Sequence, residues 1–152
     1  MPTPFVCVDQ LGTQAGYTAV DSTNPLPQNR TSEYPIAATA ISSSSGNVAA
    51  AAAVATLAAA AAKTTFITGF VITSAGATAA AVVLITITGV IGGTMTLPYA
   101  TVAGAAVGNT PLIVQFSKPI PASAVNTAIV VTLPSLGAGN TSAAVVAHGY
   151  QQ

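Results

Sequence analysis

Charged side chains are scarce in this sequence. Only 4% of the 152 residues are Asp, Glu, Lys or Arg, whereas charged residues make up about a quarter of a typical soluble domain. Three scattered cations cannot displace the counterions of a phosphate backbone, so the composition argues against a nucleic-acid partner. A surface with so little charge is poor at keeping a protein monomeric. The composition therefore favours assembly with copies of the same chain or with another protein.

Groups that carry out catalysis are also few. The chain has one His, His148, and one Cys, Cys7, and its three carboxylates all precede residue 34. A lone cysteine cannot form a disulfide within the chain, and a zinc site needs ligands that this sequence does not supply. Neither a G-x-S-x-G nucleophile motif nor a glycine-rich phosphate loop is present. We therefore expect no enzyme activity, no metal and no cofactor, and we interpret His148 as a strand-end residue with an ordinary hydrogen bond.

A membrane-spanning helix would need about 20 strongly apolar residues in succession. The uncharged interval between Lys63 and Lys118 is the longest, but Gly, Pro, Ser and Thr interrupt it throughout. The N-terminal stretch MPTPFVCVDQ has neither the basic region nor the apolar region of a signal peptide. The sequence therefore predicts a soluble protein that is not exported and has no membrane partner.

Residues 1–46 differ in composition from the rest of the chain. They contain the polar runs DSTNPLPQNR and ISSSSGN together with repeated X-Pro pairs, which favour extended or turn geometry. We predict that these residues form an extended, loop-rich N-terminal arm. Aromatic residues and arginine are the side chains most often found at the centre of protein interfaces. The candidate partner-contact residues of the arm are Phe5, Tyr17, Arg30 and Tyr34.

Residues 47–152 have the pattern of an all-β domain. Runs rich in β-branched residues are separated by turn signals, at a spacing of roughly 8–12 residues that is typical of sandwiches and barrels. No amphipathic helix pattern lies between them, which argues against a parallel sheet. We predict an antiparallel β-sandwich. The predicted strand regions are 64–73, 79–90, 92–99, 110–116, 126–134 and 141–150.

Alternation within these runs indicates which side chains face inwards. Leu112, Val114 and Phe116 fall on one face of their strand, and Ile129, Val131 and Leu133 fall on one face of another. The Thr86-Ile87-Thr88 and Thr94-Met95-Thr96 stretches are typical of the solvent face of a sandwich. Two glycines, Gly69 and Gly89, are placed where a bulge or a close backbone approach is expected. The stretch SKPIPAS, residues 117–123, is predicted to be a proline-rich turn.

The alanine-rich tract NVAAAAAVATLAAAAAK, residues 47–63, allows two interpretations. Alanine has the highest helix propensity, but a lone helix here would have neither i,i+4 ion pairs nor a partner helix. As a strand, the tract places Val48, Ala50, Ala52, Val54 and Thr56 on one face, where small side chains would let a second sheet approach closely. We favour one long strand, or two strands with a kink, over a helix. The chain would then have seven or eight strands, enough for two packed sheets.

The segment from about Lys63 to Tyr150 resembles the capsid decoration or cement proteins of tailed bacteriophages, which have a jelly-roll fold. The resemblance rests on KTTFITGFVITSAGAT, VVLITITGVIGG, TPLIVQFSKPIPAS and AIVVTLPSLGAGNTSAAVVAHGY. It covers roughly the C-terminal 60% of the chain and includes neither the arm nor the alanine tract. It implies a structural virion protein, made in the bacterial host cytoplasm, that binds the capsid exterior as a dimer or trimer and clamps neighbouring capsomers.

The expected function is therefore structural. The expected partners are the major capsid protein and the chain itself, with a dimer slightly favoured over a trimer because two-fold symmetry is the most common. An alternative is a jelly-roll module of a phage tail or fibre that binds a carbohydrate or receptor. The absence of Trp argues against that alternative, because sugars usually stack on aromatic rings.

Overall fold

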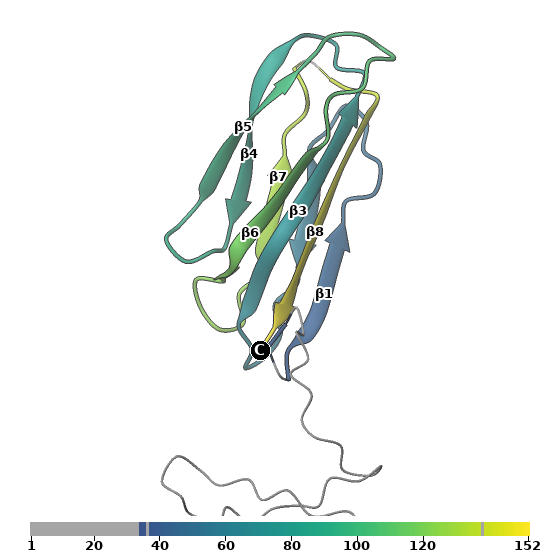
Figure 1. Cartoon of the computed structure of the whole chain (residues 1–152). Coiled ribbons are helices and arrows are strands. Elements are labelled where there is room, and N and C mark those ends of the chain that lie inside the picture. The colour runs from purple at the N-terminus through teal and green to yellow at the C-terminus, as the bar shows by residue number, and fades with distance from the viewer. Residues whose placement is uncertain (1–33, 36, 138) are drawn as a thin grey trace, which may run out of the picture. The chain divides into compact units, whose positions relative to one another are not determined.

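The computed structural model describes residues 34–35, 37–137 and 139–152, and these residues form eight β-strands and no helix (Figure 1). The predicted all-β fold is confirmed. The strands are β1 (Thr39–Ser44), β2 (Ala53–Leu57), β3 (Thr65–Ala75), β4 (Ala81–Thr88), β5 (Met95–Thr101), β6 (Leu112–Pro121), β7 (Ile129–Leu133) and β8 (Ser142–Gln151).

The strands form two four-stranded sheets, both antiparallel, with the orders β1-β8-β3-β6 and β2-β7-β4-β5. First and last strands pair, as do β2 with β7, β3 with β6, and β4 with β5. The strands that pair are thus mostly far apart in the sequence. The two sheets pack face to face as a sandwich (Figure 1).

The core lies between the sheets and consists of alternate side chains from each strand. Phe70 and Ile72 of β3 and Ile85 and Ile87 of β4 are fully buried. The predicted inward residues of β7 are also buried, and those of β6 pack against the core while the alternate residues are exposed. Period-two alternation therefore identified the inner faces of these two strands correctly.

The sandwich begins earlier than residue 47, where the sequence placed its boundary. Residues 39–44 form strand β1, which pairs with β8 along its whole length. The serine-rich composition hid this strand, because runs of serine are typical of loops. Here Ser43 of β1, and Ser45 just after it, bond to neighbouring strands. The hydroxyl of Ser43 accepts a hydrogen bond from the Thr56 amide at 3.1 Å, and that of Ser45 accepts one from the Val145 amide at 2.9 Å.

The alanine tract contains no helix, so the strand interpretation is the correct one, although the strand is short. Only Ala53–Leu57 is extended within a sheet. The inward residues are Ala53, Ala55 and Leu57, whereas Val54 and Thr56 face outwards. Small side chains do lie between the sheets here, but they are Ala53 and Ala55. The sequence pattern instead predicts the alternate residues, such as Val54 and Thr56, on the face towards the second sheet.

The predicted turn at residues 117–123 is wrong, because β6 continues as a strand through Pro121. Proline lacks the amide hydrogen that an internal strand needs, and it is tolerated where one side of the strand is unpaired. β6 is such an edge strand, since β3 is its only neighbour in the sheet. Pro119 and Pro121 therefore lie in the strand without removing a ladder hydrogen bond from a second neighbour.

Both glycines singled out in the sequence lie at close backbone approaches. The register of β3 shifts between Ile67 and Gly69 against both of its neighbours. A Cβ atom at Gly69 would lie 2.5 Å from the Val114 carbonyl oxygen. Gly89 has a φ of 80°, and a Cβ there would overlap the carbonyl oxygen of Ala128. The prediction of bulges or close approaches is confirmed at both positions.

Candidate docking surfaces

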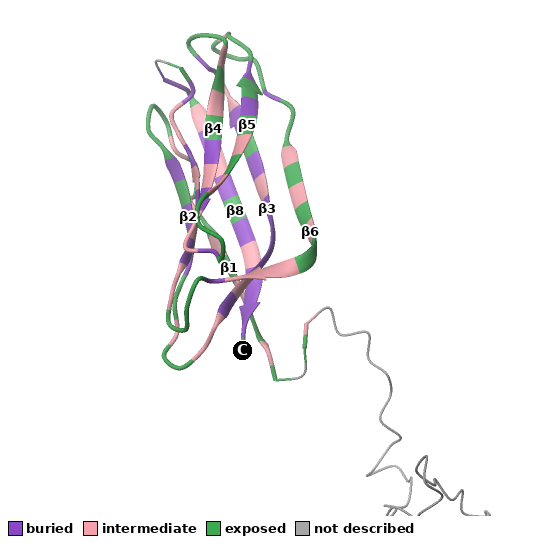
Figure 2. Ribbon diagram, turned by 90° about the vertical axis from the view of Figure 1, so that its left-hand side faces the viewer, coloured by how far each residue is buried: buried purple, intermediate pink, exposed green. Residues whose placement is uncertain are grey.

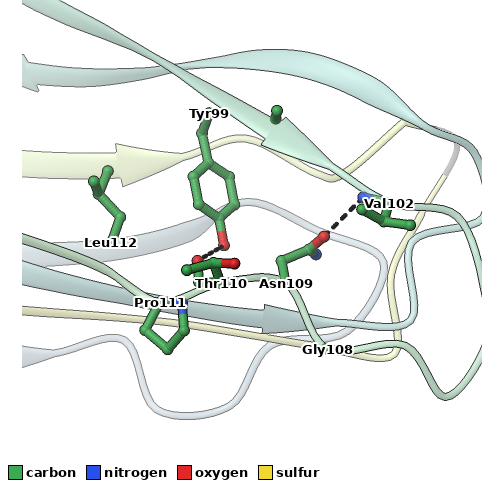
Figure 3. A pocket seen from close by; sticks show the side chains of 8 residues that line it. Tyr99, Val102, Gly108, Asn109, Thr110, Pro111 and Leu112 are labelled. Atoms are coloured by element: carbon green, nitrogen blue, oxygen red, sulfur yellow. Dashed lines mark hydrogen bonds between the residues drawn. The ribbon is translucent and has the colours of Figure 1, made fainter.

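One small pocket lies at the end of the sandwich where the β5–β6 connection crosses β3. Its volume is about 430 Å³, and it is lined by residues of β5, of the connection and of the start of β6, among them Tyr99, Asn109 and Leu112 (Figure 3). The Tyr99 ring is almost fully buried, at 6% exposure. The lining holds no Asp, Glu, His, Lys, Arg or Cys, which leaves it without the acid–base groups that most catalysis uses.

The polar atoms beside this pocket bind one another. The Asn109 side-chain amide donates to Ser74 Oγ at 3.0 Å, and Ser74 Oγ lies 3.0 Å from the Tyr99 hydroxyl. That hydroxyl donates to the Thr110 carbonyl at 3.2 Å, and Asn109 Oδ1 accepts from the Val102 amide at 2.7 Å (Figure 3). The Thr110 carbonyl can only accept, so the hydroxyl hydrogen of Tyr99 is used in that bond. Ser74 Oγ must therefore donate to the Tyr99 oxygen, and each hydroxyl of the network donates one hydrogen bond. This network ties the β5–β6 connection to β3 and leaves little polar capacity for a ligand.

The outer face of the β2-β7-β4-β5 sheet is uncharged and rich in β-branched side chains. We call it the valine–threonine face. Along β4 and β5, buried and outward residues alternate, as Figure 2 shows. Its members, row by row across the strands, are Val82 and Ala100; Leu84 and Pro98; Val54, Thr132, Thr86 and Thr96; and Thr56, Val130 and Thr88.

Three large aliphatic side chains of this face are open to solvent. Val82 is 67% exposed, Leu84 54% and Val54 43%. Beside them, Thr132, Thr86 and Thr96 form an unbroken row across three strands, because β4 pairs Thr86 with both of the others. The threonines interpreted from the sequence as a solvent face do lie on the outside of the sandwich. Their assembly with exposed aliphatic residues into one surface could not be read from the sequence alone.

The outer face of the β1-β8-β3-β6 sheet is different in character. We call it the histidine face. It carries the apolar row Ile113, Val71 and Val146, of which Ile113 is 65% exposed. The next row joins Gln115, Gly69 and His148, and the Nε2 atoms of Gln115 and His148 lie 3.1 Å apart. His148 lies within β8 and not at a strand end, and this ordinary hydrogen bond agrees with a structural role.

Aromatic residues cover one end of the histidine face. Tyr150 of β8 stacks on Phe66 of β3, with ring centroids 4.7 Å apart, and Tyr34 lies against Tyr150 at 5.4 Å. Tyr150 is 5% exposed although it points away from the core. Burial raises the pKa of the Tyr150 hydroxyl above its ordinary value. Tyr34, predicted to contact a partner, is thus engaged with its own domain.

The other predicted contact residues, Phe5, Tyr17 and Arg30, lie outside the described residues, as does Cys7. Within the part that the structure describes, the only charged side chains are Lys63 and Lys118. Lys63 Nζ donates to Thr39 Oγ1 at 3.2 Å. No group of metal-ligating side chains occurs among these residues.

No family model, curated protein or solved structure matches this chain. No helix among the described residues is long and apolar enough to cross a membrane.

Proposed function

We propose that this protein is a structural component of a phage virion that binds the outer surface of the capsid and cements neighbouring capsomers. Its partners are the major capsid protein and other copies of itself. The proposal combines the sequence resemblance to decoration proteins with the surface of the sandwich.

The observation that carries the proposal is the scarcity of charge on both broad surfaces. The strands of the valine–threonine face contain no charged residue, those of the other sheet contain only Lys118 of β6, and each face exposes aliphatic side chains. Exposed apolar patches on a folded domain are typical of interaction surfaces. Copies of a neutral domain can also be packed side by side over a shell without repelling one another.

The order of strands supports the jelly-roll part of the proposal. The eight strands lie in two sheets, with the first paired to the last and successive pairs nested inside, which is the order expected of a jelly-roll. Jelly-rolls occur in viral capsid domains and also in lectins, so this arrangement does not itself separate the two functions. The two functions are therefore separated by the residues on the surface of the sandwich.

A sugar-binding role has little support from the described surface. Sugar sites usually present an open aromatic ring, but Tyr99 in the pocket is almost fully buried and Tyr150 is covered by Tyr34 and Phe66. The amide of Asn109, a possible sugar ligand, is already bonded on both of its polar atoms. We therefore place the capsid role first.

The arm remains the proposed capsid-contact element. A truncation to residue 45 would remove strand β1 and would therefore damage the sheet as well as the arm. The appropriate test keeps the full-length chain and replaces Phe5, Tyr17 and Arg30 together by Ala, with Lys118→Ala as a control outside the arm. We expect the triple variant to bind capsid shells at least about 10-fold more weakly, equal to 1.4 kcal/mol, and the control to bind normally. Equal binding by the triple variant would refute the role of these residues.

A further inference from the structure

We propose that the valine–threonine face is the surface on which a second copy of this chain packs, face to face and related by two-fold symmetry. This inference deepens the proposed function, because it assigns the self-association of the virion protein to one sheet. The occupant is specified by three properties of the face: its exposed aliphatic residues, its hydroxyl groups and its lack of charge.

The apolar part of the face supplies a reason to associate. Val82, Leu84 and Val54 are each more than 40% exposed on a single sheet surface. Their burial would remove apolar area from water. Valine and threonine have restricted χ1 rotation, so ordering them at an interface costs less conformational entropy than ordering long flexible side chains.

The polar part of the face is complementary to a copy of itself. A threonine hydroxyl both donates and accepts hydrogen bonds, so Thr86 and Thr132 can each bond to the same residue types across a two-fold axis. A partner with fixed charges would have to bury them against a face that offers no counter-charge. A second copy of the valine–threonine face is neutral in the same way and therefore meets this requirement.

The unpaired strand edges favour association through a face instead of through edge-to-edge strand pairing. The β5 edge contains Pro98, and the β6 edge contains Lys118 and Pro119. Proline and lysine at an edge oppose the addition of another strand. At the β2 edge, the Thr56 amide is already bonded to Ser43 Oγ. Face-to-face packing of two sheets does not use the backbone groups of these edges.

The chain enters the described domain on the opposite sheet. Tyr34 packs against Tyr150 on the histidine face, so the residues that precede it are attached on that side. In the resulting dimer, the two attachment points lie on the two outward surfaces, an arrangement suited to bridging two capsomers.

The test compares two equally exposed aliphatic residues on opposite faces. In the full-length chain, Val82→Glu (67% exposed) charges the valine–threonine face, and Ile113→Glu (65% exposed) charges the histidine face. Analytical ultracentrifugation of the wild type should show a dimer. We expect Val82→Glu to raise the dimer dissociation constant about 100-fold or more, because each charge would be buried without a partner. Ile113→Glu should leave it unchanged, and both variants should keep the wild-type circular dichroism spectrum.

A wild-type monomer or trimer would overturn the inference, as would a dimer that Ile113→Glu dissociates and Val82→Glu does not. Binding to capsid shells, measured on the same samples, separates this failure from failure of the proposed function. Shell binding by a wild-type monomer refutes the dimer face alone. A dimer that obeys the prediction but does not bind shells supports the face and refutes the capsid role.

Discussion

Gln115 reaches across strand β3 to His148, and their Nε2 atoms lie 3.1 Å apart on the histidine face. The residue between them in the sheet is Gly69, which pairs with Gln115 on one side and with His148 on the other. The amide nitrogen of Gln115 can only donate, so the ring nitrogen of His148 accepts. The absence of a side chain at Gly69 is what leaves room for this link.

Gly69→Ala should therefore destabilise the protein. A Cβ at this position would lie 2.5 Å from the Val114 carbonyl oxygen and 2.7 Å from Gln115 Oε1, so backbone and side chain would both have to move. We expect a loss of about 1–3 kcal/mol in the free energy of unfolding, measured by urea denaturation. Gly108→Ala is the matched control, because a Cβ there meets nothing within 4 Å. Equal stability of the two variants would contradict this explanation of the glycine.

The stability of the protein should fall at alkaline pH through Tyr150. Burial raises the pKa of this hydroxyl in the folded state above its value of 10.0 in the unfolded chain. The neutral form is thus favoured by folding, and its contribution is complete below pH 10 and is lost as the pH rises through the folded-state pKa. Urea denaturation from pH 8 to pH 11 should show a smaller alkaline loss for Tyr150→Phe than for the wild type. Parallel curves would show that Tyr150 does not cause the loss.

Tyr34 should stabilise the domain to which it is attached. Its ring lies 5.4 Å from that of Tyr150, which also stacks on Phe66. Tyr34→Ala removes one member of this cluster, and we expect a cost of about 0.5–1.5 kcal/mol in addition to the lost apolar burial. Thermal unfolding of the full-length chain would measure it. An unchanged melting temperature would mean that the Tyr34 contact contributes nothing to folding.

The hydrogen-bond network at the pocket gives a further prediction. Asn109→Ala leaves the Val102 amide without its 2.7 Å acceptor and removes a donor to Ser74 Oγ. A typical hydrogen bond contributes about 0.5–1.5 kcal/mol, and the Val102 bond is only partly buried, so we expect a loss of about that size in urea denaturation. The same variant should bind capsid shells normally, because the network is structural. Weakened binding without a loss of stability would instead mark the pocket as part of a docking surface.

The fold class followed from the sequence because each strand region repeats the same local signal. More buried and less buried residues alternate through β7 and the first half of β6, and turn residues separate the runs. Two features were hidden because the local signal contradicted the tertiary outcome. The serine-rich sequence around β1 is typical of a polar loop, but its hydroxyls bond to neighbouring strands. Pro119 is typical of a turn, but it is tolerated in β6 because β6 is an edge strand.

The candidate docking surface could be predicted only in part. The alternation of Thr86 and Thr88 indicates an outward face, but the row that they build with Thr132 and Thr96 depends on which strands are neighbours. The pairing of Thr86 with Thr132 joins segments far apart in the chain, and no local pattern specifies it. The contact of Tyr34 with Tyr150 was hidden for the same reason, because Tyr150 lies at the other end of the sequence.

Co-sedimentation of the purified full-length chain with shells assembled from the major capsid protein of its proposed phage tests the central claim most directly. The account predicts binding that saturates at a fixed ratio of chain to capsid subunit. A chain that stays in the supernatant at all concentrations would contradict it.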